Sequence, residues 1–249
     1  YTRRGRLDVV SKALERMSNE VLIKQERNAW AVILKALAEA STNSLSHVVG
    51  GSTESVIVPH DINRLMTRIK RINTSYANGT PAGLSAKGIT DMFVSPEIMQ
   101  QIRAFAYNPV NTTGSNTDIP LTPNVRDQIW NSGGMGEIYG VTLHELLELG
   151  AAKKYNTLFK AMIDAAGSTI IGGGDTGTFV DADDEILVGV DLSRDAFVRP
   201  VARQAESGGT FSVLPDDQFV ARQEKQGFYG FLEEGRVCVD SRAVVGLAI

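Results

Sequence analysis

Residues 7–40 read LDVVSKALERMSNEVLIKQERNAWAVILKALAEA and contain neither proline nor glycine. In the first half of this segment, apolar residues recur at spacings of three and four, at Leu7, Val10, Leu14, Met17 and Val21. Such spacing places them on one face of a helix. The sequence therefore predicts one long helix, or two nearly collinear helices that meet near Ser18-Asn19.

The second half of the segment, from Ala29 to Ala38, is apolar on most of its faces. A helix of this kind in a globular protein is covered by more than one neighbouring element. We therefore expect a structural spine helix, with Trp30 in the core.

Helical and strand patterns are separated along the rest of the chain. Helices are predicted at 62–72 with Asp61 as N-cap, from Ser95-Pro96-Glu97 to about Tyr107, and at 156–165. Strands are predicted at 88–94, 138–141, 168–171, 185–190, 196–204, 210–213, 219–224 and 236–249. Residues 108–124 are rich in Asn, Thr, Ser, Gly and Pro, which predicts an exposed loop. A helical first half followed by a strand-rich last third predicts an α+β fold.

Composition limits the possible functions. The chain has 249 residues, 43% of them hydrophobic, which suits one domain or two connected subdomains. With 25 Lys and Arg against 29 Asp and Glu, the net charge of -4 gives no basic footprint. This charge argues against a sequence-specific nucleic-acid reader.

No apolar run reaches the length of a membrane-spanning helix, and no signal-peptide core is present, so we expect an intracellular protein with no membrane partner. Because the chain begins at Tyr1 rather than Met, we also expect residues upstream of it. The single cysteine, Cys238, lies in an alternating run that predicts a strand. It excludes an internal disulfide and a cysteine-based metal site.

Three segments approach known site motifs, and each lacks a required element. His144-Glu145 begins like a zinc-binding H-E-x-x-H helix, but Glu148 replaces the second histidine, which favours a His–Glu pair on a helix surface. Residues 172–177 satisfy G-x-G-x-x-G, but no helix pattern follows, which favours a flexible turn. The acidic run 181–185 lacks the glycine and glutamate of a calcium loop, which favours a solvated turn.

The sequence also contains no G-x-S-x-G nucleophile elbow, so its three histidines give no support for a Ser-His-Asp triad. We therefore assign no catalytic, cofactor-binding or metal-binding residue, and we expect no cofactor.

Several segments together resemble the major capsid proteins of tailed bacteriophages, whose fold is shared by encapsulins and the herpesvirus capsid floor. The most informative is EILVGVDLSRDAFV at 185–198, followed by the segments 219–230 and 236–247. Earlier segments fit the same order. They are the spine-helix stretch 26–38, the Phe-Val-Ser-Pro-Glu turn at 93–97 and the Ile-Tyr-Gly-Val segment at 138–141.

The resemblance implies three structural segments. Residues 1–50 would hold the spine helix of a peripheral subdomain, residues 51–171 an α/β axial subdomain, and residues 172–249 the strands of the peripheral subdomain. The N-terminal arm and extended loop of the family do not match any part of this sequence ahead of the spine helix.

The resemblance also implies a function. The chain would be a structural subunit, not an enzyme, that self-assembles through pentamers and hexamers into an icosahedral shell enclosing double-stranded DNA. Scaffold, portal and decoration proteins would be partners, together with non-specific contact with packaged DNA. Its location would be the virion capsid, after assembly in the host cytoplasm.

Two alternatives stay open. An encapsulin-like compartment shell would bind a cargo peptide in an apolar groove beside its N-terminal helix. An unrecognised enzyme would have a convergent polar pocket with perturbed titratable groups.

Overall fold

A computed structural model gives the structure of the chain and describes residues 8–43, 45–53, 55–76, 88–104, 136–167, 184–203, 211–216 and 227–249. The chain divides into two compact units. The first unit comprises Tyr1–Val32 and Phe197–Val237, and the second comprises Ile33–Ala196 and Cys238–Ile249. The predicted α+β class is confirmed by the helices and by a six-stranded sheet in the second unit.

Helix α1 (Asp8–Ala40) is one continuous helix, as in the first of the two predicted alternatives, with no break near Ser18-Asn19. Its exposure changes along its length, from Leu22 at 58% to Leu34 and Leu37 at 0%. Trp30 is also buried. The prediction of a spine helix with a covered second half is therefore confirmed.

The six-stranded sheet has the order β1-β10-β5-β2-β4-β3. Its strands are β1 (Val48–Gly50), β2 (Asp91–Val94), β3 (Glu137–Ile138), β4 (Val141–Glu145), β5 (Ile186–Val190) and β10 (Val244–Ala248). The β10–β5, β5–β2 and β4–β3 pairs are antiparallel, whereas β1–β10 and β2–β4 are parallel. Strands far apart in the sequence therefore meet at the centre of this sheet.

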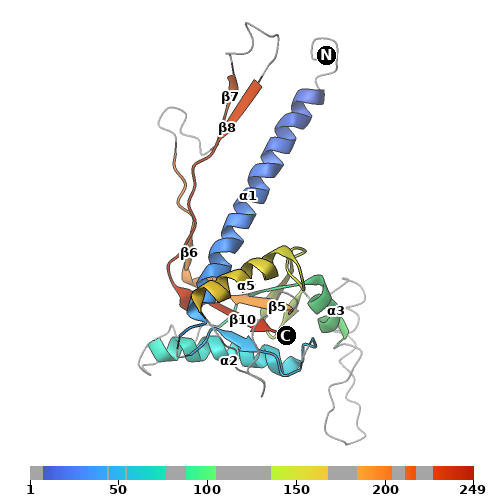
Figure 1. Cartoon of the computed structure of the whole chain (residues 1–249), viewed down its shortest axis with the longest axis vertical. Coiled ribbons are helices and arrows are strands. Elements are labelled where there is room, and N and C mark those ends of the chain that lie inside the picture. Colours follow the sequence, from blue (N-terminus) through green and yellow to red (C-terminus); the bar gives the residue numbers. More distant parts are fainter. Residues whose placement is uncertain are drawn as a thin grey trace, which may run out of the picture. The chain divides into compact units, whose positions relative to one another are not determined.

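Different helices cover the two faces of the sheet (Figure 1). The helices are α2 (Pro59–Tyr76), α3 (Pro96–Ala104) and α5 (Lys154–Ala166). On one face, α2 and α3 pack their apolar side chains against the strands to form the main core. The members of that core from the helices are Ile62, Leu65, Ile69, Ile72, Ile98, Met99 and Ile102. The opposite face carries α5 and the end of α1.

Two glycines in the central strands allow close packing on the two faces. A Cβ atom at Gly246 in β10 would lie 2.8 Å from Leu37 Cδ2 of α1. A Cβ atom at Gly189 in β5 would lie 2.9 Å from Ile89 Cδ1 on the other face. Because real Cβ contacts are longer than this, any other residue at either position would displace its neighbour.

The outer edge of β1 is covered by side chains. The Ser46 hydroxyl accepts from the N–H of Val48 (3.2 Å) and donates to its C=O (3.0 Å). Arg64 Nη1 donates to the C=O of Gly50 (3.2 Å). The inner edge pairs with β10 through contacts such as the Gly51 N–H to the Ala248 C=O (2.7 Å). Backbone groups on both edges of β1 are thus occupied.

The first unit contains the Asp8–Val32 part of α1 and extended segments. Strands β7 (Ser212–Asp216) and β8 (Gly227–Phe231) form an antiparallel pair, and β6 (Phe197–Val198) pairs with β9 (Val237–Cys238). Gly230 of β8 lies against α1, because a Cβ there would be 3.0 Å from Met17 Sδ. An ion pair between Arg199 Nη2 and Glu234 Oε2 (2.6 Å) joins the segments that follow β6 and β8.

The predicted elements are confirmed in part. Helix α3 begins at Pro96 as predicted, with the Ser95 hydroxyl accepting from the Ile98 N–H (3.1 Å), and α5 and β5 also match. Helix α2 begins at Pro59, so Asp61 lies in its first turn rather than at its N-cap. The strand predicted at 138–141 is instead a hairpin of β3 and β4. The strand predicted at 236–249 is interrupted by a 3-10 turn, η3 (Ser241–Ala243).

Seven other predicted segments are shorter, shifted or not described. The strand predicted at 88–94 begins only at Asp91, as β2. Of the strand predicted at 196–204, only β6 is formed. The strand predicted at 210–213 is shifted and corresponds to β7. The predictions for 108–124, 168–171, 172–177 and 219–224 lie outside the described residues.

The boundaries of the compact units differ from the predicted segments 1–50, 51–171 and 172–249. Strands β5 and β10 fall in the third of these segments, yet they pair with β2 and β1 in the sheet of the second unit. Hydrogen bonding across the sheet therefore groups them with residues 51–171 rather than with β7 and β8. The assignment of peripheral and axial roles to the segments stays a prediction.

The packing of Gly246 against Leu37 leads to a first testable prediction. We expect Gly246→Ala to lower the free energy of unfolding by about 1–3 kcal/mol through overpacking. Leu37→Ala should lower it by about 2–5 kcal/mol through a cavity. The double variant should lose less than the sum, because the new methyl group enters the space that Leu37 leaves. Urea unfolding followed by circular dichroism measures all three, and strictly additive losses would contradict the contact.

Candidate functional site

A histidine–aspartate pair joins strands β2 and β4. His144 Nε2 lies 2.7 Å from Asp91 Oδ1, and the Thr90 hydroxyl donates to Asp91 Oδ2 (2.7 Å). The His144 ring stacks on Phe93 with a centroid distance of 5.0 Å. Burial raises the pKa of Asp91, but the hydrogen bonds from Thr90 and His144 outweigh burial, so this pKa lies below its usual value.

Within the described residues, the histidine of this pair has no nucleophile beside it. A histidine base needs a nucleophile or a substrate proton within reach. Among the described residues, no serine, threonine or cysteine side chain is bonded to His144. The described residues also contain no group of three or more His, Cys, Asp or Glu placed to hold a metal ion. The absence of a catalytic role stays a prediction.

The prediction that His144 and Glu145 lie on a helix surface is wrong, because both residues are in β4. The segment Val141–Glu145 alternates buried and exposed side chains, with Val141 and Leu143 buried. That period of two matches a strand. Pairing of β4 with β2 on one side and β3 on the other outweighs the helical spacing of the leucines that follow.

A polar network fixes the residues that precede β5. The Ser95 hydroxyl donates to Glu185 Oε2 (2.6 Å), and Glu185 Oε1 accepts from the Ala151 N–H (3.1 Å). The buried Asn156 side chain donates to the Asp184 C=O (2.6 Å) and accepts from the Gly150 N–H (3.0 Å). Asp184 and Glu185, from the predicted solvated acidic turn, therefore have structural contacts. Residues 181–183 lie outside the described ranges.

An ionic cluster, here called the clasp, joins the turn after β5 to the turn before β10. It consists of Asp191, Arg194, Asp240 and Arg242. Arg194 Nε lies 2.8 Å from Asp191 Oδ2, and Arg194 Nη1 lies 3.5 Å from Asp240 Oδ2. Arg242 binds Asp240 through two contacts of 2.8 Å. The Asp191 side chain is 0% exposed and that of Arg194 is 3% exposed, so this part of the clasp is desolvated.

The clasp lies in the sequence close to both points at which the chain passes between its units. The first passage follows Ala196 and the second follows Val237. Asp191 also caps η2 (Leu192–Arg194) by accepting from the Ser193 N–H (3.0 Å), and Asp240 caps η3 in the same way through Arg242 (3.0 Å). The clasp therefore fixes the ends of β5 and β10 from which the first unit's extended segments depart.

The other histidines and the cysteine have structural surroundings. His47 is buried with its Nδ1 atom 3.0 Å from the Val244 C=O, and burial lowers its pKa. His60 is exposed on α2. Cys238 is in a strand as predicted, and burial raises the pKa of its thiol, which makes it a poor nucleophile.

The first unit exposes large apolar side chains on both of its parts. On α1, Leu22 is 58% and Ile23 is 45% exposed. On the β7–β8 pair, Tyr229 is 60% and Phe231 is 39% exposed. The register pairs Val213 with Gly230, which faces Met17, so Tyr229 and Phe231 point away from α1.

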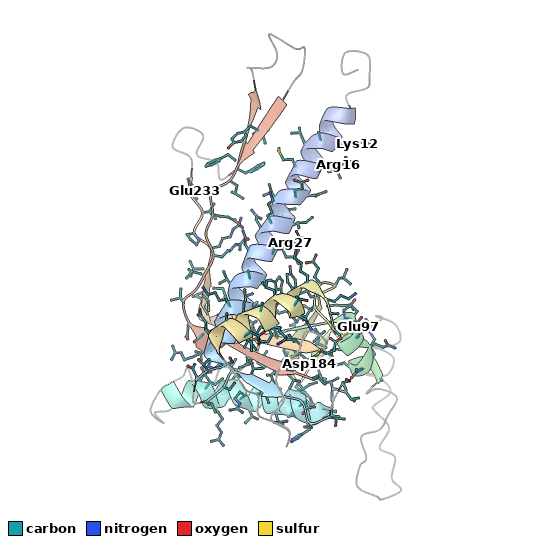
Figure 2. All side chains as sticks on the ribbon, in the orientation of Figure 1. Lys12, Arg16, Arg27, Glu97, Asp184 and Glu233 are labelled. Carbon is teal, nitrogen blue, oxygen red and sulfur yellow. The ribbon has the colours of Figure 1, made fainter. Side chains whose placement is uncertain are left out.

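Charged side chains surround the apolar residues of α1. Lys12, Arg16 and Arg27 lie along this helix (Figure 2). The exposed surface of α1 is therefore a mixture of apolar and charged side chains. Within the described residues, no helix is long and apolar enough to cross a membrane.

No protein-family model and no curated protein matches the chain. Among solved structures, a capsid chain of cyanophage P-SCSP1u is similar, with 12% identity and a TM-score of 0.52 over 99% of this chain and 68% of that chain. The SrpI encapsulin of Synechococcus elongatus has 12% identity and a TM-score of 0.46, over 94% of this chain and 63% of the encapsulin. A structure of Mycobacterium phage Che8 has 14% identity and a TM-score of 0.44, over 95% of this chain and 62% of that one.

The chain thus spans about two thirds of the length of these proteins. It has the fold of the cyanophage capsid chain.

The buried part of the clasp leads to a second prediction. We expect Asp191→Asn to lower the free energy of unfolding by about 3–5 kcal/mol, because the Arg194 charge would stay buried without its main partner. Asp195→Asn removes the same charge at an exposed position and should change stability by less than about 0.5 kcal/mol. Urea unfolding of both variants tests the difference. Equal effects would show that the clasp does not stabilise the fold.

The pKa of Asp240 leads to a third prediction. Burial raises this pKa, but hydrogen bonds and charge from Arg242, with the charge of Arg194, lower it by more. The resulting stabilisation is present above the pKa of an unfolded aspartate, about 3.9, and is lost as pH falls through the lower folded value. Stability of the parent should therefore fall more steeply below about pH 4 than that of Asp240→Asn. Parallel pH profiles from thermal melting would contradict this assignment.

Proposed function

We propose that this chain is the structural subunit of an icosahedral shell that encloses double-stranded DNA, as in tailed bacteriophages. The observation that carries the proposal is the shared fold with the cyanophage capsid chain, which extends over 99% of this chain. The order of resembling sequence segments supports the same conclusion independently of the fold. The role is structural, and no catalytic step is assigned to any residue.

The exposed apolar residues of the first unit support a role in contacts between copies. Leu22, Ile23, Tyr229 and Phe231 lose their exposure if a neighbouring subunit packs on α1 and on the outward face of β7–β8. A shell forms when the same heterologous contacts between subunits are repeated many times and close on themselves. Large side chains such as Tyr and Phe supply most of the energy of such contacts.

We assign the first unit to the peripheral role and the second unit to the axial role. This assignment keeps the six-stranded sheet intact, since β5 and β10 belong to it. The second unit would then meet its copies around five-fold and six-fold axes. Scaffold, portal and decoration proteins, assembly in the host cytoplasm and contact with packaged DNA belong to the same proposal.

The proposal is tested by assembly of the full-length gene product. We expect closed shells in negative-stain microscopy and a matching large species in light scattering. Shells that form and package a cargo peptide instead of DNA would identify an encapsulin-like compartment. A small oligomer under every salt, scaffold and protease condition would contradict both kinds of shell.

A variant pair tests the contact surface. The double change Tyr229→Asp and Phe231→Asp should reduce the yield of shells by more than about tenfold, because it places charge in a buried contact. Its melting temperature should stay close to that of the parent, since both side chains are exposed in the single chain. Ala161→Asp with Ala165→Asp adds the same charge to exposed positions of α5 as a control. Normal assembly of the β8 variant would show that this face makes no contact between subunits.

A further inference from the structure

The surface of α2 next to the edge strand β1 forms a groove of about 310 Å³. Its lining residues recur at spacings of three and four along the helix, with Val49 of β1 beside them. They are Val49, His60, Asn63, Arg64, Thr67, Arg68 and Arg71. α2 borders the second unit on the side away from α5 (Figure 1). The whole groove therefore belongs to one compact unit.

Three arginines of the groove differ in how they are held. Arg64 binds the buried carboxylate of Asp61 (3.4 Å) and the Gly50 C=O, so its guanidinium is fixed and largely neutralised. Among the described residues, neither Arg68 nor Arg71 has an ion pair or a hydrogen bond through its side chain. No acidic residue is among those that line the groove. Within the described part of the chain, the charges of Arg68 and Arg71 therefore have no counterion, whereas Arg64 has Asp61.

The charge of Arg68 lies in unfavourable surroundings. Its side chain is partly buried, and burial, followed by the charge of Arg64, lowers its pKa. The Arg68 charge also contributes to the lowered pKa of the buried His47 on the β10 side of the groove, where burial is the main cause. A cation placed beside another cation and away from water is stabilised when an anion binds between or above them.

The donor geometry suits a tetrahedral oxyanion. Residues three and four apart on a helix lie about 5–6 Å from one another at Cβ, so Arg68 lies beside both Arg64 and Arg71 on this face of α2. Arginine supplies forked donors that match phosphate oxygens, and the Asn63 amide can add another donor. The Thr67 hydroxyl does not, because it donates to the Asn63 C=O (2.9 Å).

We propose that this groove is a binding site for a phosphate group, held by Arg68 and Arg71 with Arg64 as a fixed neighbour. The phosphate can come from a nucleic-acid backbone or from a free anion. The site does not depend on the proposed shell function, since the residues that form it lie within one unit of one chain. It is a local feature of a chain whose net charge is -4.

The test uses purified protein at low salt, with inorganic phosphate and a short DNA duplex as separate probes. Calorimetry should detect saturable phosphate binding by the parent. Arg68→Gln and Arg71→Gln should each weaken it by about tenfold, the value of one charge-assisted hydrogen bond. Lys35→Gln removes one exposed positive charge elsewhere in the same unit and should change the affinity by less than about twofold. Circular dichroism confirms folding, and Arg71, being exposed, can be replaced without disturbing the core.

The duplex distinguishes the two sources. If the same variants weaken duplex binding and reduce its salt dependence, the nucleic-acid backbone is the source. If only inorganic phosphate binds, the site takes a small anion. The proposal is overturned if the parent binds neither probe, or if Arg68→Gln and Arg71→Gln bind both as tightly as Lys35→Gln. Because this experiment measures binding by a single chain, its outcome does not depend on whether the protein assembles into shells.

Discussion

The antiparallel pairing of β5 with β10 is the interaction on which the rest of the structure depends. It joins Ile186–Val190 to Val244–Ala248 at the centre of the sheet, although more than fifty residues separate the two strands in the sequence. Between the two strands, the chain enters the first unit after Ala196 and returns to the second unit after Val237. Because β10 also pairs with β1, the same strand connects the end of α1 to the sheet. The extended segments of the first unit are thus held at both ends by one ladder.

The strongest local patterns were the ones that sequence reasoning identified correctly. The uninterrupted periodicity of residues 7–40 predicted α1, and Ser95 with Pro96 predicted the start of α3, because each signal lies within the element that it predicts. His144 was misplaced because a single strand between two partners is defined by distant residues, not by its own pattern. The same reason explains why β5 and β10 were grouped with β7 and β8. Their shared period of two gives no information on which strand pairs with which.

The proposed contact and phosphate-binding surfaces carry no short sequence motif of the kind that marks many catalytic sites. No motif predicted a catalytic cluster, and Asp91 and His144 lie on two strands that only the fold brings together. The groove on α2 has a signal in the sequence, since Arg64, Arg68 and Arg71 are spaced by helical turns. The net charge of -4 does not reveal this arginine cluster, because a net charge carries no information on how charges are distributed over a surface.

The covered edge of β1 has a consequence for how copies of this protein can meet. An open strand edge is a template onto which further strands add without limit, and such addition leads to fibres. Here Ser46 and Arg64 already occupy outward-facing backbone groups of Val48 and Gly50, and the opposite edge strand, β3, is only two residues long. In the proposed shell, where copies meet at high local concentration, polymerisation through backbone hydrogen bonds is thereby disfavoured. Copies would then meet through side-chain contacts, and the angles of such contacts can curve a growing surface until it closes.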